Sequence, residues 1–420
     1  MKRLICLLFP LMLLLTGCSG IASRNNILSL LSSPKLSQRE SRIITAINQH
    51  LGQDIVLKYP KKGENISPIQ FADLNSDGTE EAVVLYSAEN TGSNVRMAVL
   101  TQNDEEWSVF FDKEGYGSEV YKISFEKLTG KPDKQIVTGY TFSDSSEKIT
   151  TVYFTDKLNI SAENTYACQD YVIHDITGDG YGDILLAGIN AENQRTQLKI
   201  LSAHYSDYLT SIATKQISVK NATVTGIAFS KSDLAQGEVI LLDYSDSYRR
   251  VYTEAIRLEG YNIESILSPD VVQKIWDENY SLNSRDIDED GYYETPTIID
   301  DGNPYTFNLK QMEWTCFLLE EPVRKYYGIC ESDSGLFFPL PYEWQGLITL
   351  ANGEEGEWGV IRTSSGRPLV NFSLIPAGGA LNTGSEIIVG KGTIQVKVLF
   401  AQEVTREQRR YIISGMTYIK

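Results

Sequence analysis

Residues 54–310 alternate between short apolar runs and polar, turn-rich segments, and the apolar runs recur at a nearly constant spacing. A residue with an acidic or amide side chain opens each aligned segment: Glu81, Gln135, Asp183, Glu238 and Glu294. These residues are separated by 54, 48, 55 and 56 positions. A unit that recurs about every 50 residues is the signature of a repeat fold.

Each repeat has room for about four strands. In the first repeat, turn residues separate candidate strands at 82–87, 95–102, 107–112 and 121–126. Four antiparallel strands at this period predict a mainly β fold, namely a β-propeller of about five four-stranded blades. We expect residues 54–59 to form a strand that completes the last blade and closes the ring.

A helix is expected before the repeats, and a small α/β domain after them. Ser37 and Glu40 match a capping box, apolar residues follow at helical spacing from Ile43 to Leu51, and Gly52 supplies a stop. Beyond residue 313 the candidate elements are strands at 346–350, 358–362, 370–375, 386–389 and 394–400 and a helix at 405–413.

The first residues have the features of an export signal. Lys2 and Arg3 precede an apolar run that ends in Leu15-Thr16-Gly17-Cys18. This segment resembles a bacterial lipoprotein signal, and the resemblance implies cleavage before Cys18, lipid on its sulfur and membrane anchorage of the mature chain. We therefore expect an extracytoplasmic protein with a signal peptide (1–17), a lipidated tether (18–36), a helix with the propeller (37–312) and a C-terminal α/β domain (313–420).

The charge balance narrows the class of partner. Removing residues 1–17 removes two of the 38 basic residues and none of the 55 acidic ones, which leaves a net charge of 36 − 55 = −19. So acidic a chain is not expected to bind nucleic acid. Cys168, Cys316 and Cys330 remain after lipidation, and this odd number does not indicate a disulfide framework, although a bridge between Cys316 and Cys330 stays open.

Three loops share the pattern D-x-[NTD]-x-D-G-x-x-[DE], with the last acid eight residues after the first. They begin at Asp73, Asp175 and Asp286. Calcium takes six to eight oxygen ligands, and a tight loop with acids at alternate positions directs them to one centre. The twelfth positions are Val84, Leu186 and Thr297 and not the Glu of an EF-hand, so the loops are expected to lead into strands. The alternative is that each is an acidic, solvated turn without metal.

Residues 54–310 resemble the FG-GAP/VCBS repeat family, which includes the β-propeller of integrin α subunits. The resemblance implies a calcium ion in loops between adjacent strands of a blade. The implied side-chain ligands are Asp73, Asn75, Asp77 and Glu81, then Asp175, Thr177, Asp179 and Asp183, then Asp286, Asp288, Asp290 and Glu294. Position seven of each loop, which is Thr79, Tyr181 or Tyr292, would add a backbone carbonyl. Residues 128–133 and 230–237 look like copies of the loop that have lost their acids.

The stretch 335–346 is similar to segments of Mog1/PsbP-like α/β sandwich domains. It lies in an aromatic-rich region that we expect to form a hydrophobic core and a domain interface, and a carbohydrate-stacking platform is the alternative. These aromatic residues are Trp314, Phe317, Tyr326, Tyr327, Phe337, Phe338, Tyr342 and Trp344.

Signals for catalysis are weak. The chain has three histidines, His50, His174 and His204, and it has no Gly-x-Ser-x-Gly, His-Glu-x-x-His or phosphate-loop motif. The expected function is therefore a lipid-anchored, calcium-binding propeller that acts as a binding or scaffold module for a protein or carbohydrate ligand. A glycan-active hydrolase or lyase on a propeller scaffold is the alternative.

Overall fold

The computed structural model describes residues 36–419 except for short segments. The segments left out are 90–91, 105, 144, 158, 191, 204–207, 218, 233–237, 275–281, 300–307, 317–322, 354–356, 376–386 and 392–393. The signal peptide, Cys18, most of the tether, His204 and Phe317 therefore lie outside the described residues.

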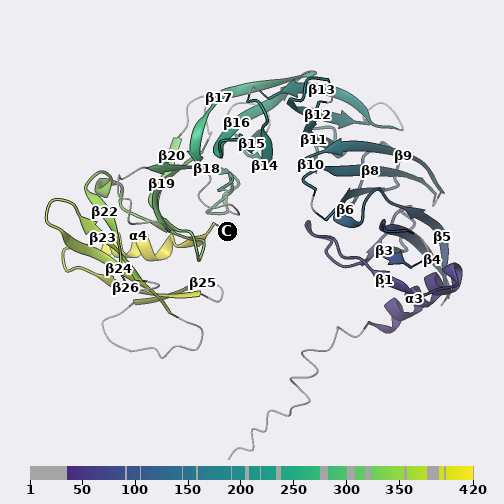
Figure 1. The fold of residues 1–420 in the computed structure, drawn as a ribbon, viewed down its shortest axis with the longest axis horizontal. Helices are drawn as coiled ribbons and strands as arrows, with labels where there is room; N and C mark the ends of the chain where they lie inside the picture. The colour runs from purple at the N-terminus through teal and green to yellow at the C-terminus, as the bar shows by residue number, and fades with distance from the viewer. Residues whose placement is uncertain are drawn as a thin grey trace, which may run out of the picture.

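Antiparallel sheets dominate the fold, and Figure 1 shows them following one another along an open arc. The first sheet contains β1 (Ile55–Leu57), β2 (Ile69–Ala72), β3 (Glu81–Ala88), β4 (Arg96–Asn103) and β5 (Glu106–Glu114). The second contains β6 (Glu119–Glu126), β7 (Gln135–Thr141), β8 (Lys148–Asp156) and β9 (Asn159–Cys168). The third contains β10 (Asp170–His174), β11 (Asp183–Ile189), β12 (Thr196–Ser202) and β13 (Thr210–Gln216).

The arc continues with two further sheets of the same kind. The fourth contains β14 (Thr223–Ser230), β15 (Val239–Ser245), β16 (Arg250–Glu259) and β17 (Asn262–Lys274). The fifth contains β18 (Glu294–Ile299), β19 (Leu309–Cys316), β20 (Val323–Glu331), β21 (Leu336–Pro339) and β27 (Thr417–Tyr418). The predicted mainly β fold, with several four-stranded antiparallel sheets, is confirmed.

The residues used to align the repeats do open equivalent strands. Glu81, Gln135, Asp183 and Glu294 are the first residues of β3, β7, β11 and β18, and Glu238 directly precedes β15. The fourth strand expected for the first repeat is wrongly placed, because residues 121–126 lie in β6 and begin the second sheet. The sequence repeat and the sheet are thus offset by one strand.

The predicted closure of the ring by residues 54–59 is wrong. β1 pairs with β3 of the first sheet, with Leu57 opposite Tyr86. The reason is that β2 pairs with only the first half of the eight-residue strand β3, so the second half is free to accept β1. Among the described residues, the first and fifth sheets share no strand pairing.

Most of these sheets are buried on both faces, which explains why their second strands are continuous apolar runs. Consecutive strand residues point to opposite faces. In β7, Ile136 belongs to a cluster with Val83 of the first sheet, whereas Val137 belongs to a cluster with Ile184 of the third sheet. The same alternation occurs in β11, where Ile184 faces the second sheet and the following residue, Leu185, packs against the fourth sheet.

Helix α3 (Gln38–Leu51) covers the outer face of the first sheet. Ile43 and Ile47 are fully buried in a cluster with Ala82 and Val84 of β3. The predicted capping box is confirmed, and the C-terminal cap Gly52 has the left-handed φ of 69° that glycine tolerates well. The helix therefore covers the apolar face of the first sheet at one end of the series of sheets, as a capping unit does in repeat proteins.

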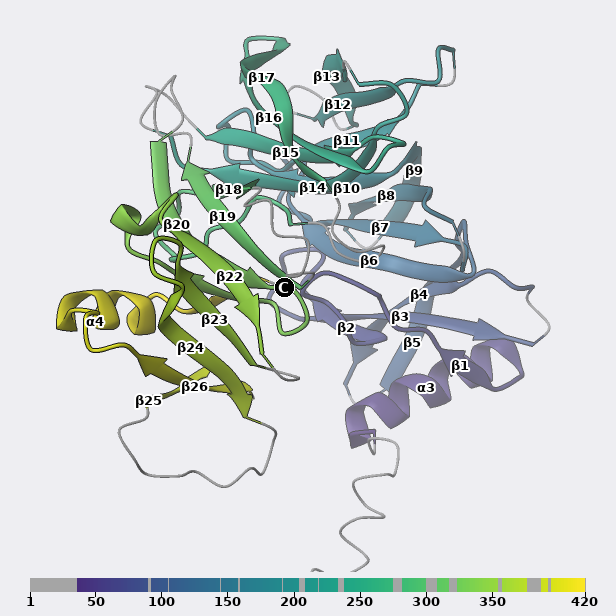
Figure 2. The ribbon, with the colours of Figure 1, turned by 60° about the vertical axis from the view of Figure 1, so that its left-hand side comes forward.

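A C-terminal sheet and helix cover the other end of the arc (Figure 2). These elements are η1 (Tyr342–Trp344), β22 (Ile348–Asn352), β23 (Glu357–Arg362), β24 (Arg367–Ile375), β25 (Ile387–Lys391), β26 (Ile394–Phe400) and α4 (Arg406–Ser414). Each predicted C-terminal element is thus found. Neither α3 nor α4 combines the length and the apolar character that crossing a membrane requires.

The fifth sheet and the C-terminal sheet share one core. Tyr327 and Phe338 of the fifth sheet are buried together with Trp358 and Phe372 of the C-terminal sheet, and the Trp358 and Phe372 rings stack at 4.0 Å. The boundary expected between residues 312 and 313 falls within β19. Among the predicted aromatic residues that the structure describes, Trp314, Tyr327, Phe337, Phe338 and Trp344 are buried, so they build cores and cannot form a stacking platform.

Candidate metal centre

The three acidic loops have the same backbone conformation. Each loop leads directly into a strand, which is β3, β11 or β18. The first aspartate of the loop accepts hydrogen bonds from two backbone N–H groups that follow it in the sequence. Asp73 accepts from Asp77 and Gly78 at 3.1 and 3.0 Å. Asp175 and Asp286 accept from the corresponding pairs at 2.7–3.1 Å. The glycine at position six has a φ of 87–89° in all three loops, which favours a residue without a side chain.

The aspartate at position five closes the next turn. Asp77, Asp179 and Asp290 accept from the backbone N–H of position seven at 2.7, 2.8 and 2.9 Å. The Thr79 N–H and the Asn75 amide lower the pKa of Asp77. The Asn75 amide donates to Asp77 at 2.8 Å, so two of the predicted ligands of the first loop contact each other.

The closing residue at position nine is buried in every loop. Glu81, Asp183 and Glu294 are at most 1 % exposed, and each accepts the backbone N–H of position two at 2.9–3.0 Å. Gln135 accepts the Leu128 N–H at 2.8 Å in the same way. The copy predicted at 128–133 thus keeps the closing hydrogen bond of the loop, and the closing side chain, Gln135, is a neutral amide.

Asp183 leaves one buried oxygen atom of the second loop without a partner. Its Oδ2 accepts from Ile176 and Thr177, whereas Oδ1 is buried and has no hydrogen-bond partner. Burial raises the pKa of Asp183, although the nearby Ser202 hydroxyl and the Thr177 N–H act in the opposite direction. A buried carboxylate oxygen without a hydrogen-bond partner fits a loop whose ligand is a cation.

The first loop has a similar charge environment. Burial raises the pKa of Glu81, and the neighbouring carboxylates of Asp77 and Asp73 raise it further. Both effects oppose the ionised form. A bound cation would relieve them because it compensates the buried negative charge.

The third loop alone, within the described part of the chain, brings three acidic groups together. Oxygen atoms of Asp286, Asp288 and Glu294 lie within 4.8 Å of one another, and this triad could hold a metal ion. Position three is Asn75 or Thr177 in the first and second loops, and the three acids that remain in each of them do not lie this close together.

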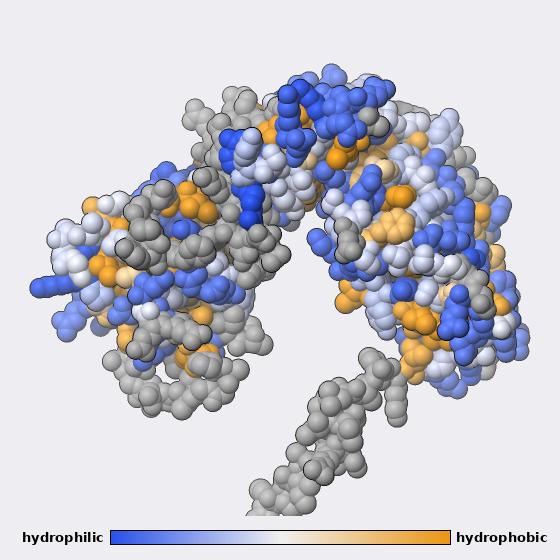
Figure 3. Space-filling model, viewed as in Figure 1, coloured by the Kyte–Doolittle hydropathy of each residue, from blue (hydrophilic) through white to orange (hydrophobic). Residues whose placement is uncertain are grey.

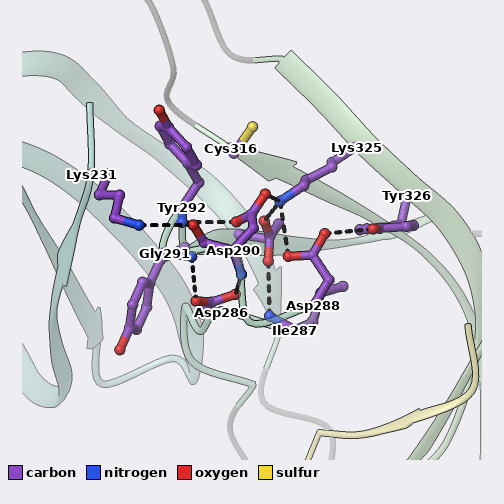
Figure 4. Close-up of polar contacts among 12 residues, drawn as sticks. Lys231, Asp286, Ile287, Asp288, Asp290, Gly291, Tyr292, Cys316, Lys325 and Tyr326 are labelled. Carbon is purple, nitrogen blue, oxygen red and sulfur yellow. Dashed lines mark hydrogen bonds and ion pairs between the residues drawn. The ribbon is translucent and has the colours of Figure 1, made fainter. Parts of the chain in front are cut away.

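Lys325 occupies the centre of the third loop, as Figure 4 shows. Its Nζ lies 3.0 Å from Asp288, 2.6 Å from Asp290 and 2.7 Å from Glu294. Burial opposes its charge, but hydrogen bonds to these carboxylates raise the pKa of Lys325. Burial also raises the pKa of Glu294 to about 7. Sequence reasoning missed Lys325, because nothing in the loop motif indicates a residue that reaches it from β20.

Each acidic loop also contacts a neighbouring sheet. The Ser76 hydroxyl donates to the Pro132 carbonyl at 2.6 Å, and the Gly182 N–H donates to the Lys127 carbonyl at 2.8 Å. In the third loop, the Gly291 carbonyl accepts the Lys231 N–H at 3.0 Å. The loops are thus part of the interfaces that hold successive sheets together.

The two described histidines each lie beside a carboxylate. His174 Nε2 hydrogen-bonds to Glu238, and its ring stacks on Phe229 at 4.0 Å. His50 lies 3.8 Å from Asp112. Cys168, Cys316 and Cys330 are buried and form no disulfide with one another, so the open alternative of a Cys316–Cys330 bridge is not found. No protein-family model and no curated protein matches this chain.

Proposed function

We propose that the chain is a lipid-anchored, extracytoplasmic, calcium-binding protein that serves as a binding or scaffold module. Its five successive sheets would be the blades of an incomplete β-propeller, and its C-terminal elements a small α/β domain. The observation that carries the proposal is the acidic loop. It recurs before β3, β11 and β18 and contacts an adjacent sheet each time, so an ion bound there would stabilise the contact between successive sheets.

Calcium fits the first two loops. Asp73, Asn75, Asp77, the Thr79 carbonyl and Glu81 would hold it in the first, and Asp175, Thr177, Asp179, the Tyr181 carbonyl and Asp183 in the second. When bound, the ion would supply positive charge to the buried closing carboxylates. Oxygen donors at alternate positions suit calcium better than softer metals.

The surface supports a binding role more than a catalytic one. Figure 3 shows mostly hydrophilic residues on the visible face, with apolar residues in scattered groups. The strongly negative mature chain favours a protein or carbohydrate ligand over nucleic acid. The described histidines are engaged in structural contacts, which gives no support to acid–base chemistry at those positions.

The test uses the full chain and a matched cysteine variant. Cys18→Ala should lose lipid labelling and membrane retention, whereas Cys168→Ala, which removes a buried thiol, should keep both. The detergent-solubilised wild type should melt at a higher temperature with calcium than with chelator. Lipid labelling of Cys18→Ala would contradict the lipid anchor. A melting temperature that is the same with calcium and with chelator would contradict calcium binding.

The ligand question needs a separate screen. The soluble protein should retain glycans or proteins without changing them. Release of products from a glycan would instead make this chain a glycan-active enzyme.

A further inference from the structure

Lys325 reaches the third loop because it is the extra residue of a β-bulge. In the pairing of β19 with β20, Trp314 lies opposite Tyr326 and Thr315 lies opposite Arg324, so Lys325 has no opposite residue. Consecutive strand residues normally point to opposite faces, and a bulge changes the direction of one of them. As a result, Lys325 and Tyr326 both contact Asp288, at 3.0 and 2.5 Å.

The same bulge occurs in two other sheets that carry an acidic loop. Phe110 is the extra residue of β5 between Val109 and Phe111. Ile212 is the extra residue of β13 between Ser211 and Ala213. In all three sheets the bulge lies across from the first two residues after the closing acid.

Phe110 and Ile212 make apolar contacts at this position. Phe110 packs against the cluster that contains Leu74, and Ile212 packs against the same cluster as Ile176. Leu74 and Ile176 are the second residues of their loops. The first and third sheets thus place an apolar side chain at the bulge, whereas the fifth sheet places an ammonium group there.

The ammonium group takes the contacts that a metal ion would need. An ammonium group has three donors, and Lys325 directs them to three carboxylates at positions three, five and nine of the loop (Figure 4). Its side chain is only 20 % exposed, and that of Glu294 is fully buried. A lysine and a calcium ion cannot both contact these oxygens at such distances.

The repeats therefore differ in what faces the closing side chain. In the second repeat, the Gln135 amide donates to the Asp133 carbonyl at 3.0 Å, so the loop needs no cation. In the fifth sheet Lys325 supplies the cation. In the third sheet Asp183 Oδ1 is buried without a hydrogen-bond partner, and the Ser202 hydroxyl lies nearby.

We propose that Lys325 is a built-in cation that replaces calcium in the third loop. The chain then binds two calcium ions, through the first and second loops, and the loop at Asp286 holds its shape without metal. The two-ion count rests on the proposed function, whereas the role of Lys325 rests on the contacts of the third loop alone.

The experiment counts calcium ions on the full-length protein in detergent by equilibrium dialysis, with free calcium raised to about 10 mM, ten times the weak end of the affinity range of extracellular modules. Wild type should bind two ions. Lys325→Met should bind three, because it exposes an intact set of carboxylates. Lys325→Arg keeps the charge and should bind two. Lys231→Met removes an ammonium group that donates to a backbone carbonyl of the loop and to none of its carboxylates in the hydrogen bonds of the described residues, and it should also bind two.

A second variant covers the case in which Lys325→Met does not fold. Asp290→Asn removes one carboxylate of the third loop, and it should leave the wild-type ion count unchanged. Three ions on wild type, or a lost ion in Asp290→Asn, would overturn the inference. A folded Lys325→Met with no added ion would do the same. Zero ions on wild type and one on Lys325→Met would support the role of Lys325 and refute calcium binding by the first two loops.

Discussion

Asp183→Asn should stabilise the calcium-free protein and remove one calcium site. Both hydrogen bonds from Ile176 and Thr177 go to Oδ2, so an asparagine oxygen can keep them. The new amide group would take the place of Oδ1, which is buried without a partner and lies near the Ser202 hydroxyl. The second repeat already uses this solution, with Gln135 as its closing residue.

The size of the effect follows from one hydrogen bond and one ion. A hydrogen bond from the new amide to Ser202 contributes about 1 kcal/mol, which corresponds to about 2 °C in melting temperature. Calcium at a hundredfold excess over its dissociation constant adds about 2.7 kcal/mol per site. Wild type with two sites should therefore gain about 5.4 kcal/mol, and Asp183→Asn with one site only about 2.7 kcal/mol.

The order of the two proteins should consequently reverse between chelator and saturating calcium. The assay is a melting curve of each protein against free calcium. Asp183→Ala is the control, because it leaves the buried Ile176 and Thr177 N–H groups without an acceptor and should be less stable than wild type in every condition. If Asp183→Asn responded to calcium as strongly as wild type does, the second loop would not be a calcium site.

Two other predictions concern the core and the pH response. Trp358→Ala should cost about 3–5 kcal/mol, and it should speed hydrogen exchange in β19–β21 as well as in β23, because these strands share one core; faster exchange in β23 alone would contradict this. Burial raises the pKa of Asp243 to about 6, although hydrogen bonds from Thr253 and Ser284 act to lower it. The folded state therefore keeps a proton that the unfolded chain loses, and stability should fall by up to about 3 kcal/mol as the pH rises from about 4 to about 6. Asp243→Asn should lack this decline in a pH series of melting temperatures, and parallel profiles for the two proteins would refute it.

Local signals in the sequence predicted the elements well. The alignment on Glu81, Gln135, Asp183 and Glu294 located the starts of β3, β7, β11 and β18. In β3, β7 and β11 the apolar run gives this signal because it is buried on both faces. The capping box at Ser37 located the start of α3, and the predicted helix at 405–413 corresponds to α4. These features depend on residues within a few positions of each other, so one sequence suffices to read them.

Features that depend on strand pairing could not be read in this way. Lys325 lies 31 residues after Glu294, and only the pairing of β18, β19 and β20 together with a bulge brings it to the loop. The aromatic composition that begins at Trp314 suggested a new domain, although several of its residues belong to a core shared with the fifth sheet. The short length of β2, which lets β1 join the first sheet, likewise gave no signal.

The open arc frees the number of repeats from a geometric constraint. In a closed ring, the rotation between neighbouring units must sum to a full circle, so one added unit changes every interface. Here α3 ends one side and the C-terminal sheet ends the other, and the buried clusters of the described residues join each of the first four sheets to its neighbours. A unit gained or lost between the third and fourth sheets would alter a single junction, and both terminal caps would remain compatible with the shorter or longer chain.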